Sequence, residues 1–170
     1  MKKALVVIDF QNDFVSGSLG FPKAETIRQP IVEKIEKALK EDTDLIFTMD
    51  THDCSYLFTK EGKSLPIEHC IKDHWGWELD DSILPYKNKG TIIEKSTFGS
   101  LQLGELLAKE NYDEVELCGL VTSICVLSNA VIAKTNLPNA NIIVDSKATE
   151  DASEKESALA CLKTIQVAVL

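Results

Sequence analysis

The chain has 170 residues, of which 44% are hydrophobic and 26% charged, an ordinary composition for one globular domain with a full core. Its net charge of −9 argues against binding to nucleic acid or to an anionic membrane surface, because both call for clustered Lys and Arg. The run Met1–Ile8 meets Asp9 too early for a signal peptide, and no apolar run approaches the ~20 residues of a membrane span. Five irregularly spaced cysteines suggest reduced thiols. We therefore expect one cytoplasmic domain over residues 1–170.

Apolar runs separated by helical patterns predict six strands in chain order. The helical patterns begin at Pro30, at Leu101, after Cys125 and at Glu154. Alternation of this kind predicts an α/β fold, a six-stranded parallel sheet with helices on both faces and strand order 3-2-1-4-5-6. The six expected strands cover Lys3–Ile8, Leu45–Met49, Thr91–Glu94, Val115–Cys118, Asn141–Val144 and Ile165–Val169.

The segment from residue 51 to 89 differs from the rest of the chain. It contains all three histidines and both tryptophans, and it shows little periodicity. A long segment of this kind is typical of an active-site loop or a small lid.

Charged and nucleophilic residues follow four of the expected strands. Asp9, Asp50, Lys95 and the turn leading to Cys125 all lie just beyond a strand's carboxyl end, which is where open α/β sheets bind ligands. In the expected order, strands one and four are neighbours, so Asp9 and Cys125 face each other. Lys95 lies two strands away but has a long side chain. Taken singly, Asp9 is as well explained as a capping carboxylate and Lys95 as a solvated strand end.

Cys125 lies where a buried strand turns into a helix. In the first turn of a helix, unpaired N–H groups and the helix dipole favour a thiolate and can hold an oxyanion, which acyl transfer to sulfur requires. The alternative is a buried structural cysteine, the role we assign to Cys118 and Cys161.

Asp50, His52 and His69 form a candidate metal site. Asp-x-His at a strand end places two ligands together, and His69 supplies a third donor suited to Zn²⁺, Fe²⁺ or Mn²⁺. A histidine bonded within the loop is the alternative role. Other nearby ligands, which we rank lower, are Cys54, Cys70 and His74.

Three motifs, Val6–Phe14, Glu94–Phe98 and Gly119–Cys125, resemble the isochorismatase-like cysteine hydrolases, most closely the nicotinamidase branch. The resemblance spans nearly the whole chain in the family's order and spacing. It implies a catalytic triad of Asp9, Lys95 and Cys125. It also implies a cis Leu120–Val121 bond, with the Val121 and Cys125 N–H groups forming the oxyanion hole.

The same resemblance implies a divalent metal, zinc before iron or manganese, held by Asp50, His52 and His69 with Glu61 as a fourth ligand. It implies that Phe14 packs against the substrate ring, with Trp75 and Trp77 as candidates for the opposite wall. The protein is expected to be a homo-oligomer. The implied reaction converts a small carboxamide, nicotinamide first, to the acid and ammonia through a thioester.

The chain departs from the nicotinamidase pattern at Asp73 and His74, where a Gly-Thr pair is usual, so a different small amide stays open as the substrate. An ether hydrolase of the isochorismatase type would usually lack Cys125 and the metal histidines. An inactive binding protein would have lost a triad residue, and none is missing. A metal-dependent hydrolase without a covalent step is a further alternative.

Overall fold

The computed structural model describes residues 1–170 and contains one sheet of six parallel strands in the order β3-β2-β1-β4-β5-β6. This confirms the predicted fold class and strand order. The strands are β1 (Lys3–Ile8), β2 (Asp44–Asp50), β3 (Thr91–Lys95), β4 (Glu114–Leu120), β5 (Asn141–Glu150) and β6 (Ala168–Val169).

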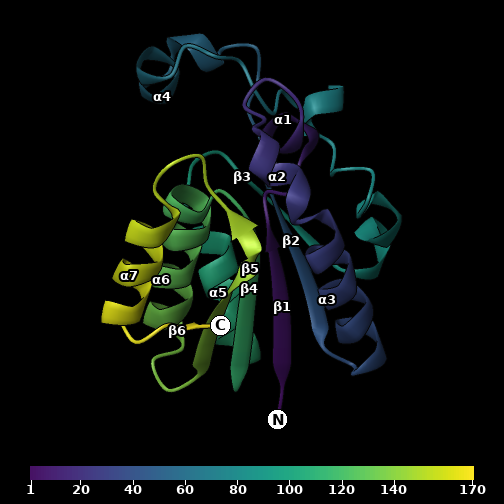
Figure 1. Cartoon of the computed structure of the whole chain (residues 1–170), viewed down its shortest axis with the longest axis vertical. Helices are drawn as coiled ribbons and strands as arrows, with labels where there is room; N and C mark the ends of the chain where they lie inside the picture. Colours follow the sequence, from purple (N-terminus) through teal and green to yellow (C-terminus); the bar gives the residue numbers. More distant parts are fainter.

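Helices cover both faces of the sheet, as Figure 1 shows: α2 and α3 lie on one side, and α5, α6 and α7 on the other. Strand β1 explains this arrangement, because alternate residues point to opposite faces and both sets are apolar. Ala4, Val6 and Ile8 belong to one core cluster, whereas Leu5 and Val7 belong to the other. The helices are α1 (Asn12–Val15), α2 (Pro22–Thr26), α3 (Arg28–Lys40), α4 (Lys60–Ser64), α5 (Leu101–Glu110), α6 (Leu127–Asn136) and α7 (Lys155–Thr164).

The most informative differences from the predicted element boundaries are at α3, β5 and β6. Helix α3 begins at Arg28, so Pro30 lies inside its first turn, where a missing N–H costs no helical hydrogen bond. The fifth strand runs on to Glu150 instead of ending at Val144. The sixth strand is shorter than predicted, because α7 extends to Thr164 and Gln166 turns the chain with a φ of +66° before β6.

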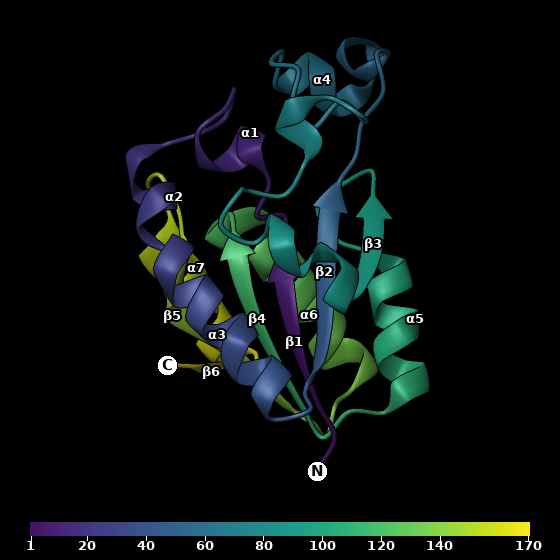
Figure 2. The ribbon, with the colours of Figure 1, turned by 90° about the vertical axis from the view of Figure 1, so that its right-hand side faces the viewer.

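Most of the segment from residue 51 to 89 lies beyond the carboxyl ends of the strands and is folded into short helical turns that include α4, whereas its last turn, η3 (Leu84–Lys89), lies beside the sheet and contacts β3 (Figure 2). Helix α4 stands away from the sheet, whereas η2 (Trp75–Trp77) packs against α1. None of the helices has both the length and the apolar composition that crossing a membrane requires.

Candidate active site

Four side chains from four neighbouring strand ends meet at the carboxyl edge of the sheet. Lys95 reaches across from β3, and its Nζ lies 2.6 Å from Asp9 Oδ2 and 3.3 Å from Asp50 Oδ1. The same nitrogen donates to Cys125 Sγ at 3.7 Å. The structure therefore brings together Asp9, Lys95 and Cys125, the three residues of the predicted triad, although two strands separate β3 from β4.

Asp9 is fully buried and is anchored by its neighbour on β2. The Thr48 hydroxyl donates to Asp9 Oδ1 at 2.6 Å, and the Asp9 N–H donates to the Thr48 carbonyl at 3.1 Å. Burial raises the pKa of Asp9, and the positive charge of Lys95 opposes that rise. An acid with a raised pKa beside a thiol is suited to accept and return a proton.

Cys125 lies in a π-helical turn, Thr122–Val126, which follows β4 and continues directly into α6. Burial raises the pKa of the Cys125 thiol well above its ordinary value, and the nearby Asp9 charge raises it further. Burial therefore opposes the thiolate that the start of the helix was expected to favour. A neighbouring base that accepts the thiol proton would offset this effect.

Two hydrogen bonds fix the turn that carries Cys125. The Asp151 carboxylate accepts from Ser123 N–H at 2.9 Å, and the buried Thr122 and Thr149 hydroxyls are 2.8 Å apart. The Leu120–Val121 peptide bond that precedes the turn is cis, as the family resemblance implies.

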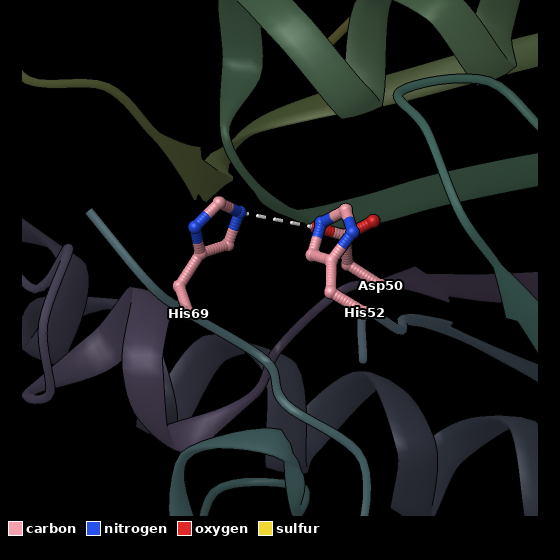
Figure 3. A group of neighbouring side chains, drawn as sticks. All are labelled: Asp50, His52 and His69. Carbon is pink, nitrogen blue, oxygen red and sulfur yellow. Dashed lines mark hydrogen bonds and ion pairs between the residues drawn. The ribbon is translucent and has the colours of Figure 1, made fainter. Parts of the chain in front are cut away.

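Asp50, His52 and His69 converge next to the triad (Figure 3), with one donor atom from each lying within 4.8 Å of the others. His52 Nε2 lies 3.0 Å and His69 Nε2 3.5 Å from Asp50 Oδ2. His69 Nδ1 donates to the Ile67 carbonyl at 2.8 Å, which leaves Nε2 with a free lone pair. Two imidazoles and a carboxylate, all buried, suit Zn²⁺, Fe²⁺ or Mn²⁺.

Glu61 lies at the edge of this group, because its Oε1 is 3.9 Å from both His52 Nε2 and His69 Nε2. The lower-ranked alternatives are outside the group: Cys54 and His74 are exposed, and the pKa of the Cys70 thiol is raised by burial. The structure thus favours the predicted ligands over these alternatives.

One cavity of about 370 Å³ connects the thiol with the candidate metal site. Its lining includes Cys125 together with the polar residues Asp50, Glu61, His69, Ser123, Asp151, Ser153 and Glu154. Trp75 and Trp77 do not line it: Trp75 is largely exposed, and Trp77 is buried with its indole N–H bonded to Thr51 Oγ1. The aromatic and aliphatic walls come instead from Phe14, Leu19, Phe21, Leu65, Phe98, Val121 and Ile124.

Sequence reasoning missed two buried polar residues at this site and misplaced one cysteine. Thr48 is a hydroxyl inside the apolar run of β2, and this irregularity was a usable signal. Asp151 follows a strand that continued beyond its expected end, so its place at the edge of the sheet was hidden. Cys161, assigned to the core, is exposed on α7, whereas Cys118 is fully buried.

The sequence matches the family model of the isochorismatase domain over residues 3–169. The chain belongs to the isochorismatase family. It is similar to the nicotinamidase of Saccharomyces cerevisiae, with 26% identity in an alignment that covers 77% of this chain and 81% of the yeast protein.

Two solved structures are similar to this chain over nearly their whole length. The nicotinamidase/pyrazinamidase of Bacillus subtilis superimposes with a TM-score of 0.88 at 30% identity, covering 99% of both chains. The pyrazinamidase/nicotinamidase of Streptococcus mutans gives a TM-score of 0.89 at 27% identity, covering 99% of this chain and 100% of that one. These relatives confirm the nicotinamidase-like branch that the three motifs predicted.

Proposed function

We propose that this amide-bond hydrolase uses Cys125 to cleave a small carboxamide, nicotinamide first, to the carboxylic acid and ammonia. One observation carries the proposal: a single cavity is lined by both the Cys125 thiol and the Asp50–His69 donor pair. A ligand in it meets a nucleophile on one side and a metal-type donor set on the other. The nicotinamidases among the relatives support the choice of nicotinamide.

The first half-reaction forms a thioester. Asp9 accepts the Cys125 proton as the sulfur attacks the amide carbonyl carbon, forming the C–S bond. The Val121 and Cys125 N–H groups hold the oxygen that becomes negative. Lys95, in contact with both the carboxylate and the sulfur, stabilises whichever of the two is charged. When the C–N bond breaks, Asp9 gives its proton to the departing nitrogen, which leaves as ammonia.

The second half-reaction restores the enzyme. Asp9 is again ionised and takes a proton from water, whose oxygen attacks the thioester carbon. The C–S bond then breaks, the sulfur is reprotonated, and the carboxylic acid leaves. Over the cycle one amide and one water give one acid and one ammonia, so the same carboxylate serves as base and acid twice.

The residues present fit a divalent metal held by Asp50, His52 and His69, with Glu61 as an additional ligand. A metal bound there would supply a Lewis-acid contact for a heteroatom lone pair of the substrate, such as a ring nitrogen. Phe14 lies 5.6 Å from the His69 ring, centroid to centroid, and so gives an aromatic substrate a wall next to that contact.

The test is ammonia release from nicotinamide by zinc-loaded protein. We expect turnover by the wild type, a loss of at least about 10³-fold in Cys125→Ala, and loss after chelation that added zinc restores. The exposed Cys161→Ala is the matched control and should keep full activity.

Activity that persists in Cys125→Ala would refute the covalent step and favour the purely metal-dependent alternative. If nicotinamide is not turned over while other small amides release ammonia in a Cys125-dependent way, the hydrolase proposal stands and the nicotinamide assignment is wrong.

A further inference from the structure

We propose that Gln11 and Asp13 are positioning residues for the metal ligands, acting through the backbone of Asp50 and of the segment that carries His69. The inference rests on the metal site of the proposed function. Neither side chain lines the catalytic cavity, and neither belongs to the ligand group. Both follow β1, Gln11 as the residue before α1 and Asp13 within α1, whereas His52 and His69 come from the segment between residues 51 and 89, which has little regular structure to hold it.

Gln11 takes the place of a neighbouring strand beside Asp50. The last backbone bond between β1 and β2 joins Asp9 N–H to the Thr48 carbonyl, so Asp50 has no strand neighbour on that side. The fully buried Gln11 amide fills this position: its Oε1 accepts from Asp50 N–H at 2.7 Å, and its Nε2 donates to the Asp50 carbonyl at 2.8 Å. A primary amide offers the same donor and acceptor as a peptide group. These two hydrogen bonds therefore fix the backbone of Asp50, and with it the position from which the Asp50 carboxylate extends.

The second N–H of the Gln11 side-chain amide donates a hydrogen bond to the part of the 51–89 segment that follows His69. The Gln11 Nε2 also donates to the Trp77 carbonyl at 2.8 Å. One buried side chain thus joins the end of β2 to the chain that returns after His69. Loss of this amide would release both ends of the ligand-bearing segment together.

Asp13 fixes the peptide that follows His69. Its Oδ2 accepts from Cys70 N–H at 2.8 Å, and the Cys70 carbonyl in turn accepts from His52 N–H at 2.9 Å. Cys70 has a φ of +47°, a conformation that a non-glycine residue keeps only when its surroundings hold it. The Asp13 carboxylate therefore holds the backbone that sets His69 and, through Cys70, the backbone of His52.

Gly76 gives an independent way to disturb Asp13. A Cβ added at Gly76 would overlap the Asp13 carboxylate, so Gly76→Ala must displace that carboxylate while leaving its charge in the protein. If Asp13 acts by position, Gly76→Ala should reproduce the effect of Asp13→Ala.

The experiment measures zinc affinity by competition with a chromogenic chelator, for wild type, Gln11→Glu, Asp13→Ala and Gly76→Ala. Glutamate keeps the size of Gln11 but cannot donate to the Asp50 and Trp77 carbonyls. We expect each variant to raise the zinc Kd about 10- to 100-fold, the range for residues that orient metal ligands. Asp145→Ala is the matched control, because Asp145 also accepts a backbone N–H, from Lys147, but lies on β5 away from the ligands. It should bind zinc as the wild type does.

Circular dichroism of the zinc-free proteins shows which variants are folded. Folded variants that bind zinc within about 2-fold of the wild type would overturn the inference, and so would an equal loss in Asp145→Ala. A wild-type protein that binds no zinc would overturn the metal site of the proposed function as well, and that result is distinguishable because it involves no variant.

Discussion

Replacement of Lys95 by Met tests whether the buried ion pairs support both folding and chemistry. The Lys95 side chain is 2% exposed and neutralises Asp9 at 2.6 Å and Asp50 at 3.3 Å. At an effective dielectric constant of about 20, unit charges 2.6 Å apart attract by about 6 kcal/mol, from which desolvation has to be subtracted. Methionine keeps the volume but leaves the two carboxylates facing each other. We expect a loss of about 3–5 kcal/mol in the free energy of unfolding.

The assay is urea unfolding of zinc-free protein, run as a double-mutant cycle with Asp9→Asn. The double variant should recover about 2 kcal/mol relative to the sum of the single losses, because removal of Asp9 removes one unpaired charge, yet it should stay inactive. Lys72→Met is the control: Lys72 pairs with Glu94 at the same 2.6 Å distance, but both side chains are exposed, so a loss under about 1 kcal/mol is expected. Equal losses in Lys95→Met and Lys72→Met, or no coupling with Asp9, would refute the reasoning.

Three further predictions concern the substrate wall, the β4 backbone and the Cys125 turn. Phe14→Leu should raise the KM for nicotinamide about 2- to 10-fold with a smaller effect on kcat, because it removes a ring contact worth about 0.5–1.5 kcal/mol. An unchanged KM would show that Phe14 does not form a wall of the substrate cavity. Gly119 has a φ of +112°, and a Cβ added there would overlap the Ile8 carbonyl. Gly119→Ala should therefore lower the free energy of unfolding in urea by about 3 kcal/mol or more. A near-neutral result would contradict this packing. Burial raises the pKa of Asp151, but hydrogen bonds from the Ser123, Ser153 and Glu154 N–H groups outweigh burial, so the pKa is lowered overall. The ionised Asp151 carboxylate therefore stabilises the fold above about pH 4, and this contribution is lost as the pH falls further. The stability difference between wild type and Asp151→Asn should therefore shrink from pH 6 to pH 3, and a constant difference would show that the Asp151 charge does not matter.

The fold was predictable because its signals are local and repeated. Strand β1 is apolar on both faces, which identifies a covered parallel strand, and charged or nucleophilic residues follow four of the six strands at the edge where ligands bind. The three motifs then identified the triad residues that the structure brings together. Boundaries were less accurate where tertiary contacts decide them, as at β5, which continues past Val144 to pair with Gly119 and Leu120 of β4.

The environment of the side chains was not predictable in the same way. The pKa of Cys125 depends on burial and on the Asp9 charge, both of which come from distant parts of the chain and cannot be read from the local strand–turn–helix pattern. Of the aromatic cavity walls only Phe14 was anticipated; Phe21 and Phe98 were missed because they lie outside the 51–89 segment to which the tryptophans had drawn attention. The oxyanion hole at Val121 and Cys125, the role of Glu61, and the homo-oligomer stay predictions.

In the proposed reaction Cys125 carries the acyl group during turnover. The most direct measurement is intact-protein mass spectrometry of zinc-loaded enzyme mixed with nicotinamide and quenched in acid, followed by peptide mapping. We expect a nicotinoyl adduct on Cys125, absent from Cys125→Ala and removed faster when hydroxylamine is present, with the hydroxamate as product. Ammonia released at full rate, with no adduct on Cys125 and no hydroxamate formed, would contradict the proposed reaction.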